Sequence, residues 1–234
     1  MTRLTLSNDQ VMLYDDFLPK ESFEPLLGHV YSSPCRLVHR GAWIKNWHSN
    51  DGLPLIGQPT FFREDGAYGP DEKSRYPTRT PLDKLMEEVR RTAGEASALI
   101  GEHGVRWNGM NVWPYLLPRG TALSMHRDAY YYSGAFIFYV HHQWDVHWGG
   151  HLVILDDRTG MGIDKDAPEM FSFLSEEAEN RVLSEPGVGL SIVPRPNRLV
   201  LLRENVYHMI TRVDADAGDR ARITLTGFFL TGNA

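Results

Sequence analysis

The chain has 234 residues, of which 42% are hydrophobic and 23% charged, and this composition fits one globular domain with a sizeable core. Its formal net charge of −6 disfavours a nucleic-acid partner, because proteins that bind the phosphate backbone usually carry a basic patch. A single cysteine, Cys35, excludes an internal disulfide, and no apolar stretch approaches the ~20 residues that span a bilayer. The first residues lack the features of a secretory signal. We therefore expect a cytoplasmic protein with no membrane or nucleic-acid partner, and we leave its oligomeric state, including a homodimer, open.

The N-terminal part, residues 1–106, is expected to hold supporting helices and loops. The apolar spacing of residues 20–32 fits an amphipathic helix. Residues 81–103 begin with Pro81, contain good helix formers and stop before Gly104, so we predict a second helix there.

Strands dominate the rest of the sequence. From Trp107 onward, β-branched and aromatic runs are broken by Gly, Pro and Asn, which is typical of strands and turns. We expect residues 107–234 to form a double-stranded β-helix, or jelly roll, with the two helices packed outside one sheet. Residues 157–187 interrupt the pattern as an insertion that contains a short helix over 169–183. The prediction is one domain over residues 1–234, mainly β with α.

Two segments lack a regular period and are candidates for covering the open side of the barrel. The first, residues 39–62, contains Trp43 and Trp47 with Gly52 and Gly57 as possible hinges, and the second is the insertion. We expect the first segment to line the substrate pocket, and ordinary surface loops are the alternative.

A short motif, His126-Arg127-Asp128, has the residue types of a metal site. Residues two apart in a strand share a face, so His126 and Asp128 project together. A third ligand is available at His208, where another apolar strand begins or ends. Two histidines and one carboxylate on one face of a ferrous ion are the arrangement of non-haem Fe(II) oxygenases. The alternative is a chance triplet with His208 as a core histidine.

The C-terminal strand places two kinds of side chain on opposite faces. Alternation groups Ala221, Ile223 and Leu225 on one face and Arg220, Arg222, Thr224 and Thr226 on the other. If helices cover the apolar face, the arginines point into a cavity, where a guanidinium needs an anionic partner. A dicarboxylate such as 2-oxoglutarate would provide it, whereas a solvated edge strand would need none.

Several motifs in this order resemble one known family. They are "HRD", "FIFYVHHQWDVHWGGHL", "IVPRPNRLVLL" leading to His208, and "GDRARITLTGFF", and together they span most of residues 107–230. The stretch "LYDDFLPKESFEPLL" is similar to the family's entry into its supporting helix. The chain thus resembles the Fe(II)/2-oxoglutarate-dependent dioxygenases, and among them the prolyl-hydroxylase-like group.

The resemblance implies roles for particular residues. The implied iron ligands are His126, Asp128 and His208. Arg220, in the Gly-x-Arg position of "GDR", would bind the distal carboxylate of 2-oxoglutarate, Tyr139 would assist it, and Tyr115 would lie near the cofactor pocket. The interval from His208 to Arg220 is longer than is usual in the family, so Arg222 is a competing anchor.

Four other histidines are assigned no metal. These are His141, His142, His147 and His151, because a facial triad is complete without them. Of the four, only His141 shares strand parity with Tyr139 and is a candidate for reaching the substrate pocket.

The resemblance also implies a reaction that uses Fe(II), 2-oxoglutarate and O₂. Oxidative decarboxylation of 2-oxoglutarate to succinate and CO₂ is coupled to oxidation of a C–H bond, and the carboxylate of Asp128 favours hydroxylation over halogenation. We expect a small-molecule substrate such as an amino acid or a natural-product intermediate. The alternatives are a hydroxylase of a peptide or protein side chain, a cupin-like metal dioxygenase that does not use 2-oxoglutarate, and a catalytically silent β-barrel binding module.

Overall fold

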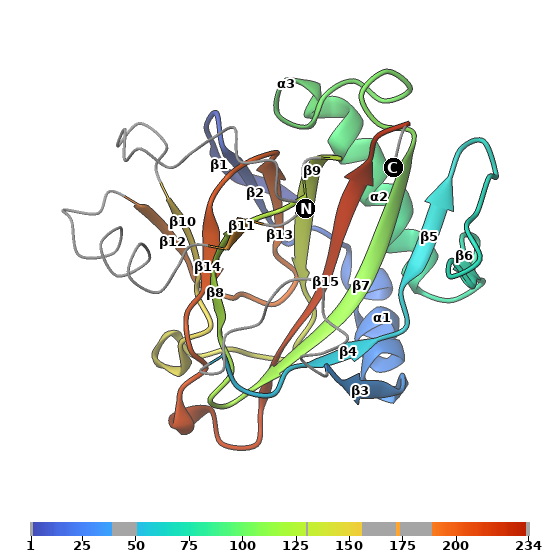
Figure 1. The fold of residues 1–234 in the computed structure, drawn as a ribbon. Coiled ribbons are helices and arrows are strands. Elements are labelled where there is room, and N and C mark those ends of the chain that lie inside the picture. Colours follow the sequence, from blue (N-terminus) through green and yellow to red (C-terminus); the bar gives the residue numbers. More distant parts are fainter. Residues whose placement is uncertain (1, 39–50, 130, 156–171, 174–188, 233–234) are drawn as a thin grey trace.

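The computed structural model describes residues 2–38, 51–129, 131–155, 172–173 and 189–232. Within these ranges the chain forms two sheets that face each other around a central cavity, with helices outside one of them (Figure 1). This is the predicted double-stranded β-helix with supporting helices. No helix of the described part is both long and apolar enough to cross a membrane.

The larger sheet has the strand order β1-β2-β13-β9-β15-β7-β4-β3, with β5 beside β7 and β6 beside β5. Its strands are β1 (Arg3–Ser7), β2 (Val11–Asp15), β3 (Cys35–Leu37), β4 (Leu55–Gly57), β5 (Thr60–Arg63), β6 (Ser74–Arg75), β7 (Gly109–Pro118), β9 (Tyr132–Tyr139), β13 (Leu199–Arg203) and β15 (Ala221–Leu230). All of these pairs are antiparallel except β5 with β6. The N-terminal part of the chain therefore extends this sheet at both edges in addition to supplying helices and loops.

The smaller sheet has the order β11-β8-β14-β10-β12. Its strands are β8 (Leu123–Arg127), β10 (Leu152–Leu155), β11 (Ser172–Phe173), β12 (Gly189–Ile192) and β14 (His208–Ile210). Strand β11 lies inside the predicted insertion, within the range 169–183 where a helix was expected. That prediction is wrong at these two residues, because they pair with the edge strand β8 instead of forming a helical turn.

The helices are α1 (Lys20–Ser32), α2 (Leu82–Glu95) and α3 (Ser97–Ile100), with 3₁₀ turns η3 (Val146–Trp148) and η5 (Ala215–Ala217). The predicted helix over 81–103 is thus broken at Ala96 and ends at Ile100. The chain turns at Gly101, which has a φ of +88°. A Cβ there would lie 2.7 Å from the Cβ of Arg106, so only glycine fits, and its carbonyl accepts the indole N–H of Trp107 at 3.0 Å.

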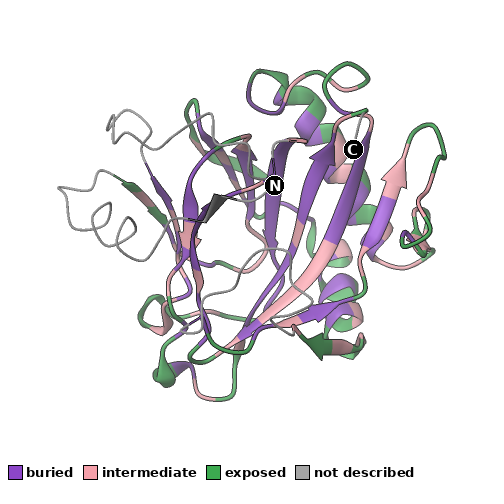
Figure 2. Ribbon diagram, viewed as in Figure 1, coloured by how far each residue is buried: buried purple, intermediate pink, exposed green. Residues whose placement is uncertain are grey.

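The main core lies between the helices and the outer face of the larger sheet. Ile223 and Leu225 of β15 pack there with Leu85 and Val89 of α2 and Leu26 of α1, and all five are buried. In Figure 2 most of β9 and β15 has the colour of buried residues. Burial of each such side chain contributes about 1.5–3 kcal/mol. The helices therefore cover the apolar face of β15, as alternation predicted, and the opposite face is available for polar side chains.

Two segments singled out in the sequence fall largely outside the described residues. Residues 39–50, with Trp43 and Trp47, are not described, and of the insertion only Ser172 and Phe173 are. The described end of the 39–62 segment forms β4 and most of β5. None of residues 51–62 is among those that line the central cavity, although Asp51 contacts the strand that carries His126.

Candidate metal centre

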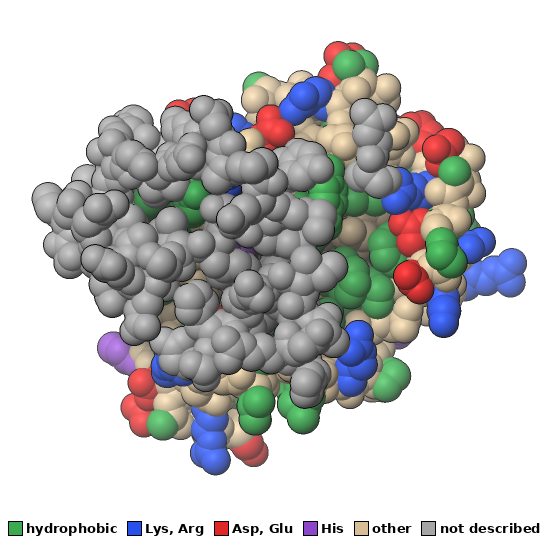
Figure 3. All heavy atoms as spheres, viewed as in Figure 1, with side chains coloured by type: hydrophobic (Ala, Val, Ile, Leu, Met, Phe, Trp, Pro, Cys, Tyr) green, Lys and Arg blue, Asp and Glu red, His purple; other side chains and the backbone are tan. Residues whose placement is uncertain are grey.

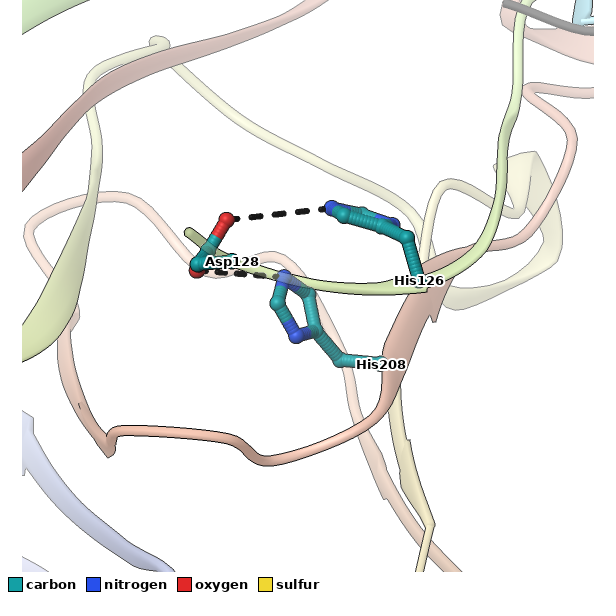
Figure 4. Close-up of side chains that lie close together, drawn as sticks. All are labelled: His126, Asp128 and His208. Atoms are coloured by element: carbon teal, nitrogen blue, oxygen red, sulfur yellow. Dashed lines mark ion pairs between the residues drawn. The ribbon is translucent and has the colours of Figure 1, made fainter. Parts of the chain in front are cut away.

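The three candidate ligands meet where β8 and β14 lie side by side. His126 on β8 is directly opposite His208 on β14, and Asp128 follows the end of β8 by one residue. The Nε2 atom of His126 lies 4.0 Å from Asp128 Oδ1, and Nε2 of His208 lies 3.8 Å from Asp128 Oδ2 (Figure 4). These separations leave room for an ion at about 2 Å from each donor.

Both histidines are held in the tautomer that a metal needs. Nδ1 of His126 lies 2.8 Å from the carbonyl oxygen of Ser124, and Nδ1 of His208 lies 2.9 Å from that of Val206. Because a carbonyl only accepts hydrogen bonds, each Nδ1 carries the proton and each Nε2 has a lone pair that faces Asp128. Both rings are buried, so this orientation is fixed before any ion binds.

The triad lines a cavity enclosed by both sheets. Its other polar groups come from Tyr115, Arg222, Thr224 and Thr226. The remaining lining residues are apolar: Leu117, Leu123, Ala135, Ile137, Leu152, Leu202, Ile210 and Phe228. Such a cavity is polar at a few points and excludes water elsewhere, as binding sites for small molecules usually do.

The two candidate arginines occupy different environments. Arg222 is fully buried and donates from Nε to the carbonyl of Gly150 at 2.7 Å and from Nη2 to the hydroxyl of Tyr139 at 3.3 Å. Within the described part of the chain its Nη1 has no hydrogen-bond partner. Arg220, in contrast, is exposed and is not a residue that lines the cavity. Its Cζ atom lies 4.8 Å from the ring centre of Trp148. A bound anion would satisfy the unmet donor of this buried guanidinium.

The two candidate tyrosines also differ. Tyr139 is buried behind Arg222 and contacts that side chain without lining the cavity. Tyr115 lines the cavity, and burial, together with the negative charge of Asp128, raises its pKa above the usual value. Its hydroxyl therefore stays protonated and can donate a hydrogen bond.

The other histidines stay apart from the triad. His141 is buried, and burial lowers the pKa of its imidazole to about 4, so the ring is neutral. It packs near Tyr139 and Trp144 but is not a lining residue, so it does not reach the cavity as parity suggested. His142 and His147 are exposed, and Nε2 of His151 lies 3.0 Å from the carbonyl oxygen of Val146.

Two contributors were not singled out from the sequence. The carbonyl of Gly150 orients Arg222, and its φ of +65° together with a Cβ distance of 2.9 Å to Arg222 Cδ requires glycine there. Phe228 lines the cavity and stacks on Tyr132, with ring centres 4.2 Å apart. The Gly149-Gly150 pair and the alternation of β15 were the available signals.

The family model described as the 2OG-Fe(II) oxygenase superfamily matches residues 110–230. The chain therefore belongs to this superfamily, which implies Fe(II), 2-oxoglutarate and O₂ as its cofactor and co-substrates. The donor set agrees with this, since two histidines and a carboxylate suit Fe(II) and the unmet Arg222 donor suits a carboxylate. Membership also disfavours the cupin-like alternative that lacks 2-oxoglutarate and the silent binding module.

Solved structures share the fold at low sequence identity. A prolyl-4-hydroxylase from Pseudomonas putida is 15% identical with a TM-score of 0.57, covering 95% of this chain and 94% of that one. A Trichoplax adhaerens prolyl hydroxylase in complex with a hypoxia-inducible-factor peptide fragment is 11% identical with a TM-score of 0.55, over 97% and 86% of the two chains. The epimerase SnoN, in complex with Fe³⁺, α-ketoglutarate and nogalamycin RO, is 10% identical with a TM-score of 0.55, over 95% and 79%. No curated protein sequence matches the chain significantly.

Proposed function

We propose that this protein is an Fe(II)- and 2-oxoglutarate-dependent hydroxylase of a small molecule, such as an amino acid or a natural-product intermediate, with His126, Asp128 and His208 as its iron ligands. One observation carries the proposal: the three convergent donors and a buried arginine with an unmet donor line the same cavity. When bound, the iron supplies the redox chemistry that couples decarboxylation of 2-oxoglutarate to oxidation of a C–H bond. The carboxylate of Asp128 would hold one coordination position of the iron, which favours hydroxylation over halide transfer.

Arg222 is the proposed anchor for the distal carboxylate of 2-oxoglutarate. Arg222, whose Nη1 donor is unmet among the described residues, and Thr224 both line the cavity, whereas Arg220 is exposed. Tyr139 and the carbonyl of Gly150 fix the guanidinium from behind. The protonated hydroxyl of Tyr115 is a further donor within the cavity.

The cavity lining supports a substrate that presents an uncharged group to the metal. Among the described lining residues Arg222 is the only arginine or lysine, and 2-oxoglutarate would occupy it. Further hydrophobic side chains gather over β7 and β5 on the face shown in Figure 3. There Trp113, the neighbour of Thr226 across the sheet, packs on Phe61 with ring centres 6.2 Å apart. A hydrophobic part of a small molecule fits this surface.

A peptide or protein side chain is the second candidate substrate. Its support is the fold shared with a prolyl hydroxylase that was solved with a peptide, whereas the fold shared with SnoN, solved with nogalamycin RO, supports a small molecule. A cytoplasmic location remains a prediction from the sequence.

The test is a screen for succinate release by the Fe(II)-loaded protein with 2-oxoglutarate under air. Two panels are compared: small molecules with hydrophobic parts, including amino acids, and proline-containing peptides. We expect stimulation by members of the first panel and a product that is heavier by one oxygen atom. Stimulation by peptides alone would replace the small-molecule proposal, and no succinate with either panel or in their absence would contradict a 2-oxoglutarate-dependent activity.

A further inference from the structure

Strand β8 is irregular just before the ligand His126. In its pairing with β14, His208 is opposite His126 but Ile210 is opposite Leu123, so β8 has one more residue than β14 between these two pairs. A β-bulge of this kind bends the strand and redirects a side chain, and bulges are common beside active sites. The bulge, which contains Ser124, therefore helps to set the direction of His126.

Ser124 connects the ligand to a buried carboxylate. Its carbonyl oxygen accepts the Nδ1 proton of His126 at 2.8 Å. Its own N–H donates to Asp51 Oδ2 at 3.2 Å, and its hydroxyl lies 2.8 and 2.9 Å from the two oxygens of the same carboxylate. Both main-chain groups of this bulge residue thus have side-chain partners, one of which is the proposed iron ligand.

The position of Asp51 is fixed by its own backbone. The residue is 2% exposed, and its main-chain carbonyl oxygen accepts the N–H of Ala122 at 2.8 Å. The next residue, Gly52, has a φ of +82°, and a Cβ there would lie 2.6 Å from the carbonyl oxygen of Gly120. This close approach to the turn between β7 and β8 brings the carboxylate to the bulge. Burial of a carboxylate is costly, so its hydrogen bonds to Ser124 matter.

The second histidine is supported differently. Nδ1 of His208 bonds to the carbonyl of Val206, whose side chain is apolar and buried. A hydrogen-bonded carboxylate therefore lies behind His126, whereas a hydrocarbon group lies behind His208. The two ligands should respond differently to loss of the residues behind them.

We propose that Asp51 is a positioning residue of the metal centre: it holds Ser124, which orients His126, and so strengthens binding of the divalent ion. This inference rests on the proposed role of His126 as an iron ligand. Partners that orient a metal-binding histidine typically change metal affinity about 10–100-fold when they are removed. If Asp51 only stabilised the bulge, its loss would lower stability without altering the affinity of the folded protein for metal.

The test titrates Co²⁺ into the metal-free full-length protein and records both the affinity and the visible spectrum of the bound ion. We expect Asp51→Asn to weaken Co²⁺ binding about 10–100-fold and to alter the spectrum, because the ligand field depends on the orientation of His126. The matched control is Asp15→Asn, which alters another buried carboxylate at the end of β2, paired with Arg198 at 2.8 Å. That variant should unfold at a lower temperature but bind Co²⁺ with wild-type affinity and spectrum.

Two variants of Ser124 complete the test. Ser124→Ala removes the hydroxyl contacts and should produce a smaller change in the same direction, and Ser124→Thr, which restores a hydroxyl, should recover wild-type binding. If Asp51→Asn does not fold, the Co²⁺ affinity and spectrum of Ser124→Ala test the positioning role of Asp51. Wild-type affinity and spectrum in both Asp51→Asn and Ser124→Ala would overturn the role of Asp51. If His126→Ala also leaves Co²⁺ binding unchanged, the metal-site assignment fails instead.

Discussion

The two faces of β15 are equally buried but chemically opposite. Ile223 and Leu225 point outward and are 3% and 1% exposed, whereas Arg222 and Thr224 point inward and are 0% and 1% exposed. The outward pair packs in a hydrocarbon core beneath the helices, and the inward pair lines the cavity with the metal triad. Burial alone therefore does not separate stability from function in this strand. The distinguishing feature is a buried donor, Nη1 of Arg222, that the described protein groups leave unmet.

The largest expected effect comes from the inner side. Asp128→Ala removes one of the three donors, so Fe(II) affinity and turnover should fall together, by more than about 100-fold, since removing a ligand should exceed the effect of removing its supporting partner. Iron binding and succinate release are the measurements, and thermal unfolding of the metal-free variant is the control. Unchanged succinate release would remove this carboxylate from the site.

The arginines give a matched pair on and beside the same strand. Arg222→Met removes a buried cation and should weaken 2-oxoglutarate binding about 100-fold, because the distal carboxylate loses its charged partner. Arg220→Met alters an exposed side chain and should leave that affinity near the wild-type value. The measurement is the KM for 2-oxoglutarate in both variants. A larger rise of the KM in Arg220→Met than in Arg222→Met would identify Arg220 as the residue that binds 2-oxoglutarate.

Substitutions on the helix-covered face of β15 should change the stability of the protein but not its metal binding. Ile223→Ala, next to Arg222, leaves a void in the core between the sheet and the helices and should lower the free energy of unfolding by about 2–5 kcal/mol. Denaturant unfolding measures the loss. Co²⁺ affinity of the folded variant should stay close to wild type, and a parallel loss of metal binding would show that the two faces are coupled.

A smaller, pH-dependent effect is expected at His141. Burial lowers the pKa of this imidazole to about 4, below its unfolded value of about 6.5. The unfolded chain therefore binds the proton more readily between these values, and the stabilisation present above pH 6.5 is lost as pH falls towards 4, by up to about 3 kcal/mol. His141→Gln should flatten this part of the stability profile, with the exposed neighbour variant His142→Gln as the control. An equally steep profile in His141→Gln would assign the acid sensitivity to other groups.

The fold and the triad were accessible from the sequence for a physical reason. Strand alternation fixes which residues share a face, so the spacing of His126 and Asp128 and the division of β15 into two faces were readable from the chain. The different environments of Arg220 and Arg222 were not, because they depend on where β15 begins. Arg222 lies one residue inside the strand, and Arg220 precedes it.

Features that depend on contacts between distant segments were out of reach. Ser172 and Phe173 form a strand because they meet β8, although their local sequence favoured a helix. The break at Ala96 and the turn at Gly101 depend on Arg106 and Trp107. Likewise, Asp51 contacts Ser124 only because Gly52 permits close approach to Gly120. The periodicity of the sequence does not predict this contact.

We propose that one cavity holds both an iron ion and 2-oxoglutarate. The most direct test of this proposal is an anaerobic titration of 2-oxoglutarate into the Fe(II)-loaded protein, monitored by the visible charge-transfer absorption that arises when the two are bound together. We expect absorption that saturates at about one 2-oxoglutarate per iron-loaded chain, as for a single facial-triad site. Iron that remains bound without any such absorption, or absorption that persists undiminished in His208→Ala, would contradict it.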